Sequence, residues 1–298
     1  MATQNEDGGD GHARQPRPEP VEGRMEIASR GSTSSRQGWR ASHASSPAPC
    51  AAKSATLLGT GAILLWATLA SLTTLKGAIP PFQTTAIVFA IGGSVVLLAA
   101  ALRGRLGLVK PTAASLGLGI AGLFGYHALY FAALALAPPA EAHLIASLWA
   151  LFTVLFSGLL PGQRLRPVHI GAALLGLGAA TILVWDKLGT ESGGSASGAG
   201  FALAFACALV WSSYSVASRL FAQVPSESIA VACLATSLLA LASSLAFETW
   251  QAPDAISWLA LLGLGLGPVG AAFLLWDIGM KTGNVPLLGV LSYASPIL

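Results

Sequence analysis

The sequence is 298 residues long, 54% hydrophobic and only 10% charged, with 16 basic and 13 acidic residues and a formal net charge of +3. An ordinary soluble domain carries about a quarter charged residues. The composition therefore excludes a water-soluble globular protein, and it favours an all-α polytopic membrane protein.

Residues 1–53 form a polar N-terminal tail that holds six of the acids and seven of the bases. The tail is rich in Ser, Pro, Gly and Arg, so it cannot bury enough apolar surface to offset the entropy of ordering. No apolar core with a cleavage site follows its bases, which argues against a signal peptide. We expect a disordered cytoplasmic tail, either an upstream extension with translation starting at Met25 or later, or an arm that touches anionic lipid.

Nine apolar spans follow the tail, each close to the roughly 20 residues that cross a bilayer core about 30 Å thick. Short connections with Pro, Gly and charged residues separate the spans. They lie near residues 56–75, 82–102, 112–134, 141–160, 168–185, 199–220, 228–247, 256–279 and 285 to the end. The predicted fold is therefore a helical bundle in contact with lipid.

The basic residues of the short loops predict the orientation of these spans, because Lys and Arg are retained on the cytoplasmic side. With the N-terminus inside, the outer loops hold only Lys76 and Lys187. The inner loops and span ends hold seven bases: Arg103, Arg105, Lys110, Arg164, Arg166, Arg219 and Lys281. This asymmetry places the N-terminus in the cytoplasm.

A shift of 145 residues lays the chain on itself with coincident span boundaries, although few residues are identical. The matched pairs are Trp66 and Trp211, Pro80 and Pro225, Gly122 and Gly267, Gly125 and Gly270, and Ser147 and Ser292. Each unit then has five helices, the first at 54–186 and the second at 199–298, where it is apparently truncated before its last helix, and an odd unit inverts in the membrane. Ten helices are expected in two inverted repeats. The tenth would fall near 313–329, so we expect a C-terminal truncation, with a natural nine-helix protein as the alternative.

The cysteines and the charged residues of the spans give little sign of special chemistry. Cys50, Cys207 and Cys233 form no CxxC pair, so neither a disulfide framework nor a zinc or other metal site is expected. No cofactor is expected. Asp277 and Lys281 stand four apart near the inner end of span eight, in an order that favours an ion pair.

Several aromatic and polar residues fall near the middle of their spans. Trp and Tyr normally collect at the membrane interfaces, and Trp185, Trp250 and Trp258 fit that rule. Trp66, Trp149 and Trp211 do not, and Tyr126, His127, Pro268 and Ser292 share their depth. For each Trp alone, helix packing explains the position equally well. Together the three favour a midplane pocket.

His127 is the sole obvious midplane group that titrates, and ionisable residues at this depth usually face a cavity. Glu141 and His143 begin span four at the outer surface, where they are solvated or line an exit. No carboxylate lies deep in a span, which argues against a proton site of that kind. In span eight, Gly267 and Pro268 interrupt the helix at mid-depth and are our candidates for a hinge.

Three segments resemble the EamA-type branch of the drug/metabolite transporter superfamily, and within it the aromatic amino-acid exporters of the YddG type. They run from Gly125 to Ala133, from Leu148 to Ala150, and from Met280 through Gly283 into Leu288–Pro296. The likeness covers residues 56–298 and leaves out the tail. It implies export of aromatic and other neutral amino acids from a bacterial cytoplasm across the inner membrane.

The resemblance also implies a central cavity open alternately to either side. On matching positions, Trp149 and Trp211 would stack on an apolar or aromatic side chain. Tyr126, His127 and Ser292 would hydrogen-bond the amino-acid head. The absent tenth helix is a departure from the family, and it puts one cavity wall in doubt.

We therefore expect a carrier of a small molecule, without covalent chemistry and without a nucleic-acid partner. A monomer is compatible with this plan. Transport is expected to be passive or gradient-driven, because no GxxxxGK[ST] motif is present. The alternatives are a purine, a sugar or an organic cation as substrate, and, in another class, an intramembrane enzyme with His127 as base and Ser147 or Ser292 as nucleophile. The sequence contains neither a GxSxG motif nor an HExxH motif, so no enzyme motif supports this last alternative.

Overall fold

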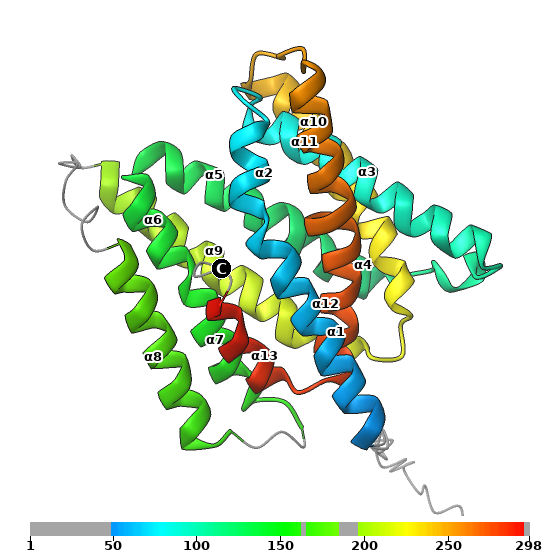
Figure 1. Ribbon diagram of the computed structural model, residues 1–298, viewed down its shortest axis with the longest axis vertical. Coiled ribbons are helices and arrows are strands. Elements are labelled where there is room, and N and C mark those ends of the chain that lie inside the picture. Colours follow the sequence, from blue (N-terminus) through cyan, green and yellow to red (C-terminus); the bar gives the residue numbers. More distant parts are fainter. Residues whose placement is uncertain (1–48, 162–164, 185–195, 295–298) are drawn as a thin grey trace, which may run out of the picture. The chain divides into compact units, whose positions relative to one another are not determined.

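The computed structural model describes residues 49–161, 165–184 and 196–294 (Figure 1). Within these ranges every regular element is helical, in agreement with the predicted all-α membrane fold. The predictions for most of the tail, for Arg164, for Trp185 and for Lys187 lie outside the described residues. The chain from 46 to 298 forms one compact unit, and the following description concerns that unit.

Thirteen α-helices make up the described part of the bundle. They are α1 (Pro49–Ala67), α2 (Leu69–Leu75), α3 (Pro81–Leu102), α4 (Ala113–Ile120), α5 (Tyr126–Leu136), α6 (Pro139–Ala146), α7 (Leu148–Ser157), α8 (Pro167–Val184), α9 (Ala196–Ala217), α10 (Ile229–Phe247), α11 (Ala255–Leu264), α12 (Ala272–Thr282) and α13 (Val285–Leu291). Short π or 3-10 turns adjoin them: η1 (Leu106–Leu108), η2 (Ala121–Gly125), η4 (Ser218–Phe221), η5 (Ser226–Ser228), η6 (Gly265–Ala271) and η7 (Ser292–Ala294).

Seven continuous helical stretches of the described residues are long and apolar enough to cross a membrane. They are Cys50–Leu75, Pro81–Leu102, Ala113–Leu136, Pro139–Ser157, Gly198–Phe221, Ser226–Phe247 and Ala255–Thr282. The predicted fifth span corresponds to α8, and the ninth to the shorter helical stretch Val285–Ala294. The helices thus follow the predicted spans in order.

Local sequence signals fix where several of these helices begin. The side chains of Thr112, Asp254 and Asn284 accept hydrogen bonds from backbone N–H groups of the first turns of α4, α11 and α13. Such caps satisfy donors that a helix cannot satisfy itself. At Asp254 the bonds from Ser257 stabilise the carboxylate and lower its pKa.

Spans three and eight are each interrupted by a π-helical segment, η2 and η6. Pro268 lies inside η6, where it lacks a backbone donor and prevents a regular α-helical ladder. Segments of this kind are often found at functional sites. The offset of 145 residues that aligns the two halves of the sequence lays η2 within η6.

One end of the bundle, which we call the N-terminal side, is the end at which α1 begins. There Asn284, ahead of α13, donates its backbone N–H to Thr56 Oγ1 of α1 over 2.9 Å. Arg219, at the end of the α9 stretch, donates to the carbonyl of Gly283 over 2.8 Å. A salt bridge of 2.9 Å joins Arg105, after α3, to Glu227, before α10.

The opposite side is held by a second set of contacts. The carboxylate of Glu248, after α10, accepts the backbone N–H groups of Phe82 and Gln83 at the start of α3, at 2.7 and 2.9 Å. Gln83 and Gln251 exchange two further hydrogen bonds. Burial lowers the pKa of the nearby Lys76, and the charge of Glu248 opposes this by raising it. Together the two sides show that successive spans run antiparallel.

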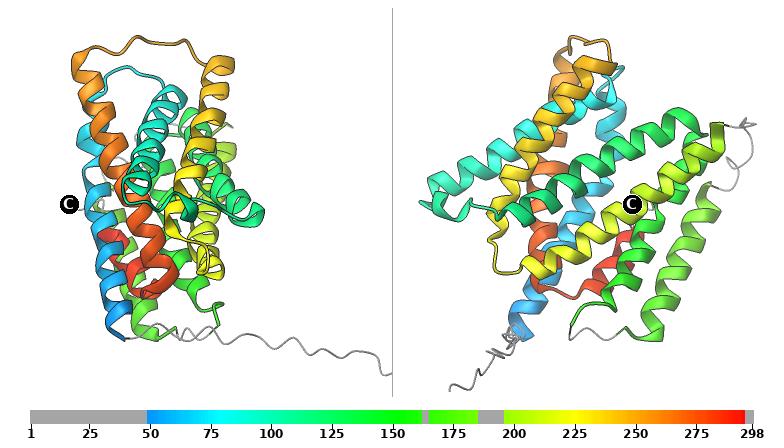
Figure 2. Two further views of the ribbon diagram at one scale, coloured as in Figure 1. Left: turned by 90° about the vertical axis from the view of Figure 1, so that its right-hand side faces the viewer. Right: turned by 180° about the vertical axis from the view of Figure 1, so that it is seen from behind.

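Close packing of helices depends on glycine at two crossings. Helix α1 lies along α12 (Figures 1 and 2), and a Cβ on Gly279 would stand 2.9 Å from the Cα of Gly59. Where α3 meets η6, a Cβ on Gly92 would stand 2.8 Å from the backbone nitrogen of Gly270. Small residues allow such approach in membrane bundles. These glycines allow span eight, which η6 interrupts, to pack closely against spans one and two.

Candidate functional site

Three tryptophans from three spans meet in the centre of the bundle. Trp66 of α1 lies 5.7 Å from Trp211 of α9 and 6.4 Å from Trp149 of α7, between ring centroids. Trp149 and Trp211 are 6.1 Å apart. All three pairs are edge-to-face, the geometry that the ring quadrupoles favour. The structure thus brings together the three tryptophans that the sequence singled out by depth.

Helix α12 supplies two further rings that sequence reasoning did not select. Trp276 lies 5.1 Å from Trp66 and 6.0 Å from Trp149, and Phe273 lies 5.9 Å from Trp66. A spacing of three residues puts Phe273 and Trp276 on one face of α12. That spacing was the available signal. We call Trp66, Trp149, Trp211, Phe273 and Trp276 the aromatic cluster.

Tyr126 and His127, directly after the π-helical segment η2, border this cluster. Tyr126 lies 5.2 Å from Trp211, and His127 lies 5.1 Å from Phe89 of α3. His127 Nδ1 is 2.7 Å from the carbonyl oxygen of Leu123. Because a carbonyl only accepts, Nδ1 carries the proton, and in the neutral ring Nε2 is then an acceptor.

A line of polar aromatic residues runs from Tyr126 toward the opposite side of the bundle. Tyr126 stacks on Tyr130 with 5.9 Å between centroids and an interplanar angle of 6°. The hydroxyl of Tyr130 is 2.9 Å from Nδ1 of the exposed His143. From the sequence, we expected His143 either to be solvated or to line an exit for substrate. Its bond to Tyr130 links it to the site.

The hydrogen bonds of the tryptophans distinguish their roles. Trp66 Nε1 donates to the carbonyl of Pro268 over 2.9 Å, and Trp276 Nε1 donates to Ser215 Oγ over 3.1 Å. Trp211 Nε1 is buried and has no acceptor in the described part of the chain. A buried donor without a partner is costly and requires an explanation. A ligand acceptor at this position would supply one.

The remaining predicted site residues take other positions. The buried hydroxyl of Ser292 donates to Leu288 O of its own helical stretch over 2.8 Å, so its proton is used within that stretch. Gly267 and Pro268 both lie in η6, and the Pro268 carbonyl anchors Trp66. Substrate contact by Ser292 and hinge motion at Gly267 and Pro268 stay predictions.

The predicted ion pair between Asp277 and Lys281 is confirmed, with 2.7 Å between Nζ and Oδ2. Its setting differs from the sequence prediction, which treated both charges as ordinary. Their side chains are only 6% and 7% exposed, because α4, α9 and α10 cover this face of α12. Lys281 Nζ also donates to the carbonyl of Val224 over 2.8 Å.

The arrangement is suited to binding rather than to bond chemistry. Indole faces accept flat apolar rings by edge-to-face or offset stacking. They also attract an ammonium group. Trp211 Nε1 offers a donor, and His127 Nε2 an acceptor. Among the described residues, no group of three or more His, Cys, Asp or Glu side chains is placed to hold a metal ion.

Comparison with known proteins places these observations in context. Residues 53–185 and 198–298 match the EamA-like transporter family. The chain is 52% identical over 246 residues to the aromatic amino acid exporter YddG of Ancylobacter novellus, covering 82% of this chain and 86% of that one. It is 26% identical over 262 residues to the aromatic amino acid exporter YddG of Salmonella typhimurium, with coverage of 82% and 85%. A solved crystal structure with 51% identity superimposes with a TM-score of 0.79, covering 82% of this chain and 85% of that one.

Proposed function

Because the chain belongs to the EamA-like transporter family, we propose that it exports aromatic and other neutral amino acids by alternating access. The family resemblance found in the sequence is confirmed by the match, and the chain is a multi-pass membrane protein. Two relatives are aromatic amino acid exporters, and this supports the substrate class.

The observation that carries the proposal is the aromatic cluster with its unpaired donor. Five rings from spans one, four, six and eight converge, and Trp211 Nε1 has no acceptor among the described residues. An aromatic side chain would stack on Trp149 and Trp211. Its amino-acid head would bond to Tyr126, His127 and Ser292, and to the free indole N–H.

Alternating access would use the two halves of the chain. We propose two inverted repeats, at 54–186 and 199–298, that rock around the aromatic cluster. Two features support this arrangement. Helix α1 packs along α12, and in the same way α9 packs along α5. The third span of each repeat also contains a π-helical segment. Gly267 and Pro268 would act as the hinge, since Pro268 breaks the helix where Trp66 is anchored.

We further propose that the carrier lies in a bacterial inner membrane with its N-terminal side in the cytoplasm. Arg105, Arg219 and Lys281 lie on the N-terminal side, and Lys76 lies on the opposite side. Retention of basic residues in the cytoplasm then gives this orientation. Substrate would be taken up from the N-terminal side and released at the opposite side.

Counterflow of labelled tryptophan in proteoliposomes tests the function directly. We expect saturable tryptophan counterflow that unlabelled phenylalanine competes with and that sugars and organic cations leave unchanged. Replacement of Trp149 or His127 by Ala should reduce it at least about tenfold, the loss of one or two binding contacts. Trp258→Ala is the matched control, because Trp258 is 44% exposed near the start of span eight. Wild-type flux through both site variants would exclude the assigned site.

A further inference from the structure

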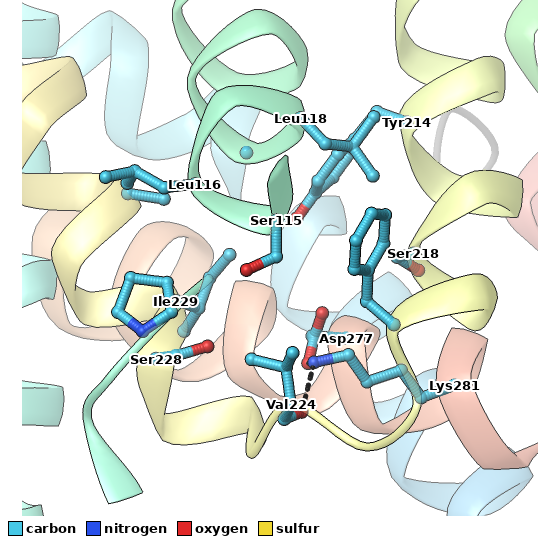
Figure 3. Close-up of a pocket in the computed structure, with 14 residues that line it drawn as sticks. Ser115, Leu116, Leu118, Tyr214, Ser218, Val224, Ser228, Ile229, Asp277 and Lys281 are labelled. Atoms are coloured by element: carbon cyan, nitrogen blue, oxygen red, sulfur yellow. Dashed lines mark hydrogen bonds and ion pairs between the residues drawn. The ribbon is translucent and has the colours of Figure 1, made fainter. Parts of the chain in front are cut away.

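A second polar site lies between the aromatic cluster and the N-terminal side of the bundle. A cavity of about 30 Å³ is lined by residues of α4, α9, α10 and α12. Tyr214, Ser115, Ser228 and the Asp277–Lys281 pair border it (Figure 3). A volume of this size holds about two waters and no amino acid. The cavity is therefore too small for an amino acid in this conformation.

The ion pair at this cavity is buried within a membrane span. Asp277 Oδ2 lies 2.7 Å from Lys281 Nζ, and both side chains are 7% exposed or less. Lys281 Nζ also donates a hydrogen bond to the Val224 carbonyl over 2.8 Å. A buried pair is costly unless further bonds satisfy both groups. A charged pair inside a membrane span is by default a candidate functional site.

Tyr214 connects this cavity to the aromatic cluster. Its side chain lines the cavity, and its ring lies 5.5 Å from Trp211. Tyr214 packs on Gly122 of η2 so closely that a Cβ at Gly122 would overlap it. Tyr214 therefore borders both the cavity and the aromatic cluster.

The repeat itself does not require these charges. The offset of 145 residues places Ala132 opposite Asp277, Leu136 opposite Lys281 and Leu69 opposite Tyr214. The corresponding positions of the first repeat are thus apolar. At these matched positions the charged pair therefore occurs only in the second repeat, on the N-terminal side of the bundle.

We propose that Asp277 and Lys281 form an access site for zwitterionic amino acids on the N-terminal side, behind a gate made by Tyr214; this inference rests on the proposed amino-acid export. An amino acid carries one ammonium and one carboxylate, the same two charges as the pair. On opening, Asp277 takes the substrate ammonium and Lys281 takes the substrate carboxylate. The exchange leaves no charge uncompensated, and displacement of Tyr214 passes the substrate to Trp211.

Head-group analogues of tryptophan separate this role from simple packing. Tryptophanamide lacks the carboxylate, and N-acetyltryptophan lacks the ammonium. The measurement is kcat/KM for tryptophan and for each analogue, from initial flux into proteoliposomes well below saturation, with protein-free liposomes as background. Lys281→Met should lower the preference for tryptophan over tryptophanamide about tenfold, the value of one charge-assisted hydrogen bond. Asp277→Asn should lower the preference over N-acetyltryptophan by a similar factor.

Control variants make the result decisive. Lys281→Arg and Asp277→Glu keep the charges and should keep both preferences, and Lys110→Met tests an exposed base on the same side. If the single variants do not fold, the neutral double variant Asp277→Asn with Lys281→Met removes the uncompensated charge, and it should lose both preferences. Equal loss of flux for all three compounds would overturn the access site. Absence of tryptophan flux in the wild type would instead contradict the proposed function.

Discussion

Trp66 and Trp211 occupy matching positions in the two halves of the chain but differ in their hydrogen bonds. Trp66 Nε1 is bonded to the Pro268 carbonyl, whereas Trp211 Nε1 has no acceptor among the described residues. We therefore assign Trp66 to the stability of the broken span eight. We propose that Trp211, whose N–H has no acceptor among the described residues, binds substrate. Replacement of each by Phe, which removes the N–H and keeps a ring, tests this difference.

Trp66→Phe should lower the free energy of unfolding by about 1–3 kcal/mol more than Trp211→Phe, because it leaves the buried Pro268 carbonyl without a donor. Trp211→Phe should raise the KM for tryptophan about tenfold and leave the melting temperature nearly as in the wild type. Thermal melts in detergent and counterflow kinetics provide the two measurements. If both variants shift KM and stability alike, the two tryptophans have the same role.

At the residue scale, the depth of a residue within its span could be predicted from the sequence, but the direction in which its side chain points could not. Counting from the span ends located Trp66, Trp149 and Trp211 near the midplane, and the structure brings them together. Trp276 was not selected from the sequence because it lies closer to the end of span eight than to its middle. Only the packing of α12 against α1 turns it toward Trp66.

At the scale of elements, α3 and α10 form a helix pair that is fixed at both ends. Glu248 caps α3 with two hydrogen bonds on the opposite side, while Arg105 and Glu227 meet on the N-terminal side. The bond from Ser237 Oγ to Ala86 O, at 2.6 Å, adds a contact between the two ends. Alternating access would then leave this pair intact and move other spans around it.

The two end contacts should differ in strength. Glu248→Ala removes two charge-assisted hydrogen bonds and exposes N–H groups at a helix start, so we expect a loss of about 3 kcal/mol in unfolding free energy. Glu227→Ala breaks an ion pair whose Arg105 side chain is 50% exposed. Solvent screens such a pair, and its loss should cost about 1 kcal/mol or less. Thermal melts of the two variants in one detergent compare them, and a larger effect of Glu227→Ala would contradict this ranking.

The elements also show where sequence patterns stop being informative. Pro268 among glycines predicted a break in span eight, and η6 lies there. In span three no proline marks the interruption, yet η2 forms there, next to Tyr126. Contacts such as Glu248 with Phe82, 166 residues apart in sequence, are set by the assembled bundle and leave no local signal.

For the whole molecule, hydropathy was sufficient to predict the order and approximate limits of the spans. This works because a bilayer forces every backbone polar group into helical hydrogen bonds. Exposed apolar side chains such as Leu102, Leu159 and Phe247, each at least 80% exposed, fit contact with lipid. The inversion of the repeats and the orientation in the membrane are not fixed by hydropathy, and they stay predictions.

Orientation can be measured by labelling single cysteines in whole cells with a membrane-impermeant maleimide. Gly107 and Thr249 are exposed, on the N-terminal side and the opposite side respectively, and a Cβ at Gly107 would meet no atom within 4 Å. In a background with the exposed Cys50 replaced by Ser, the buried Cys207 and Cys233 should stay unlabelled. Thr249→Cys should react in intact cells, and Gly107→Cys only after permeabilisation. The opposite pattern would place the N-terminal side outside, and the Asp277–Lys281 site would then face the side of release.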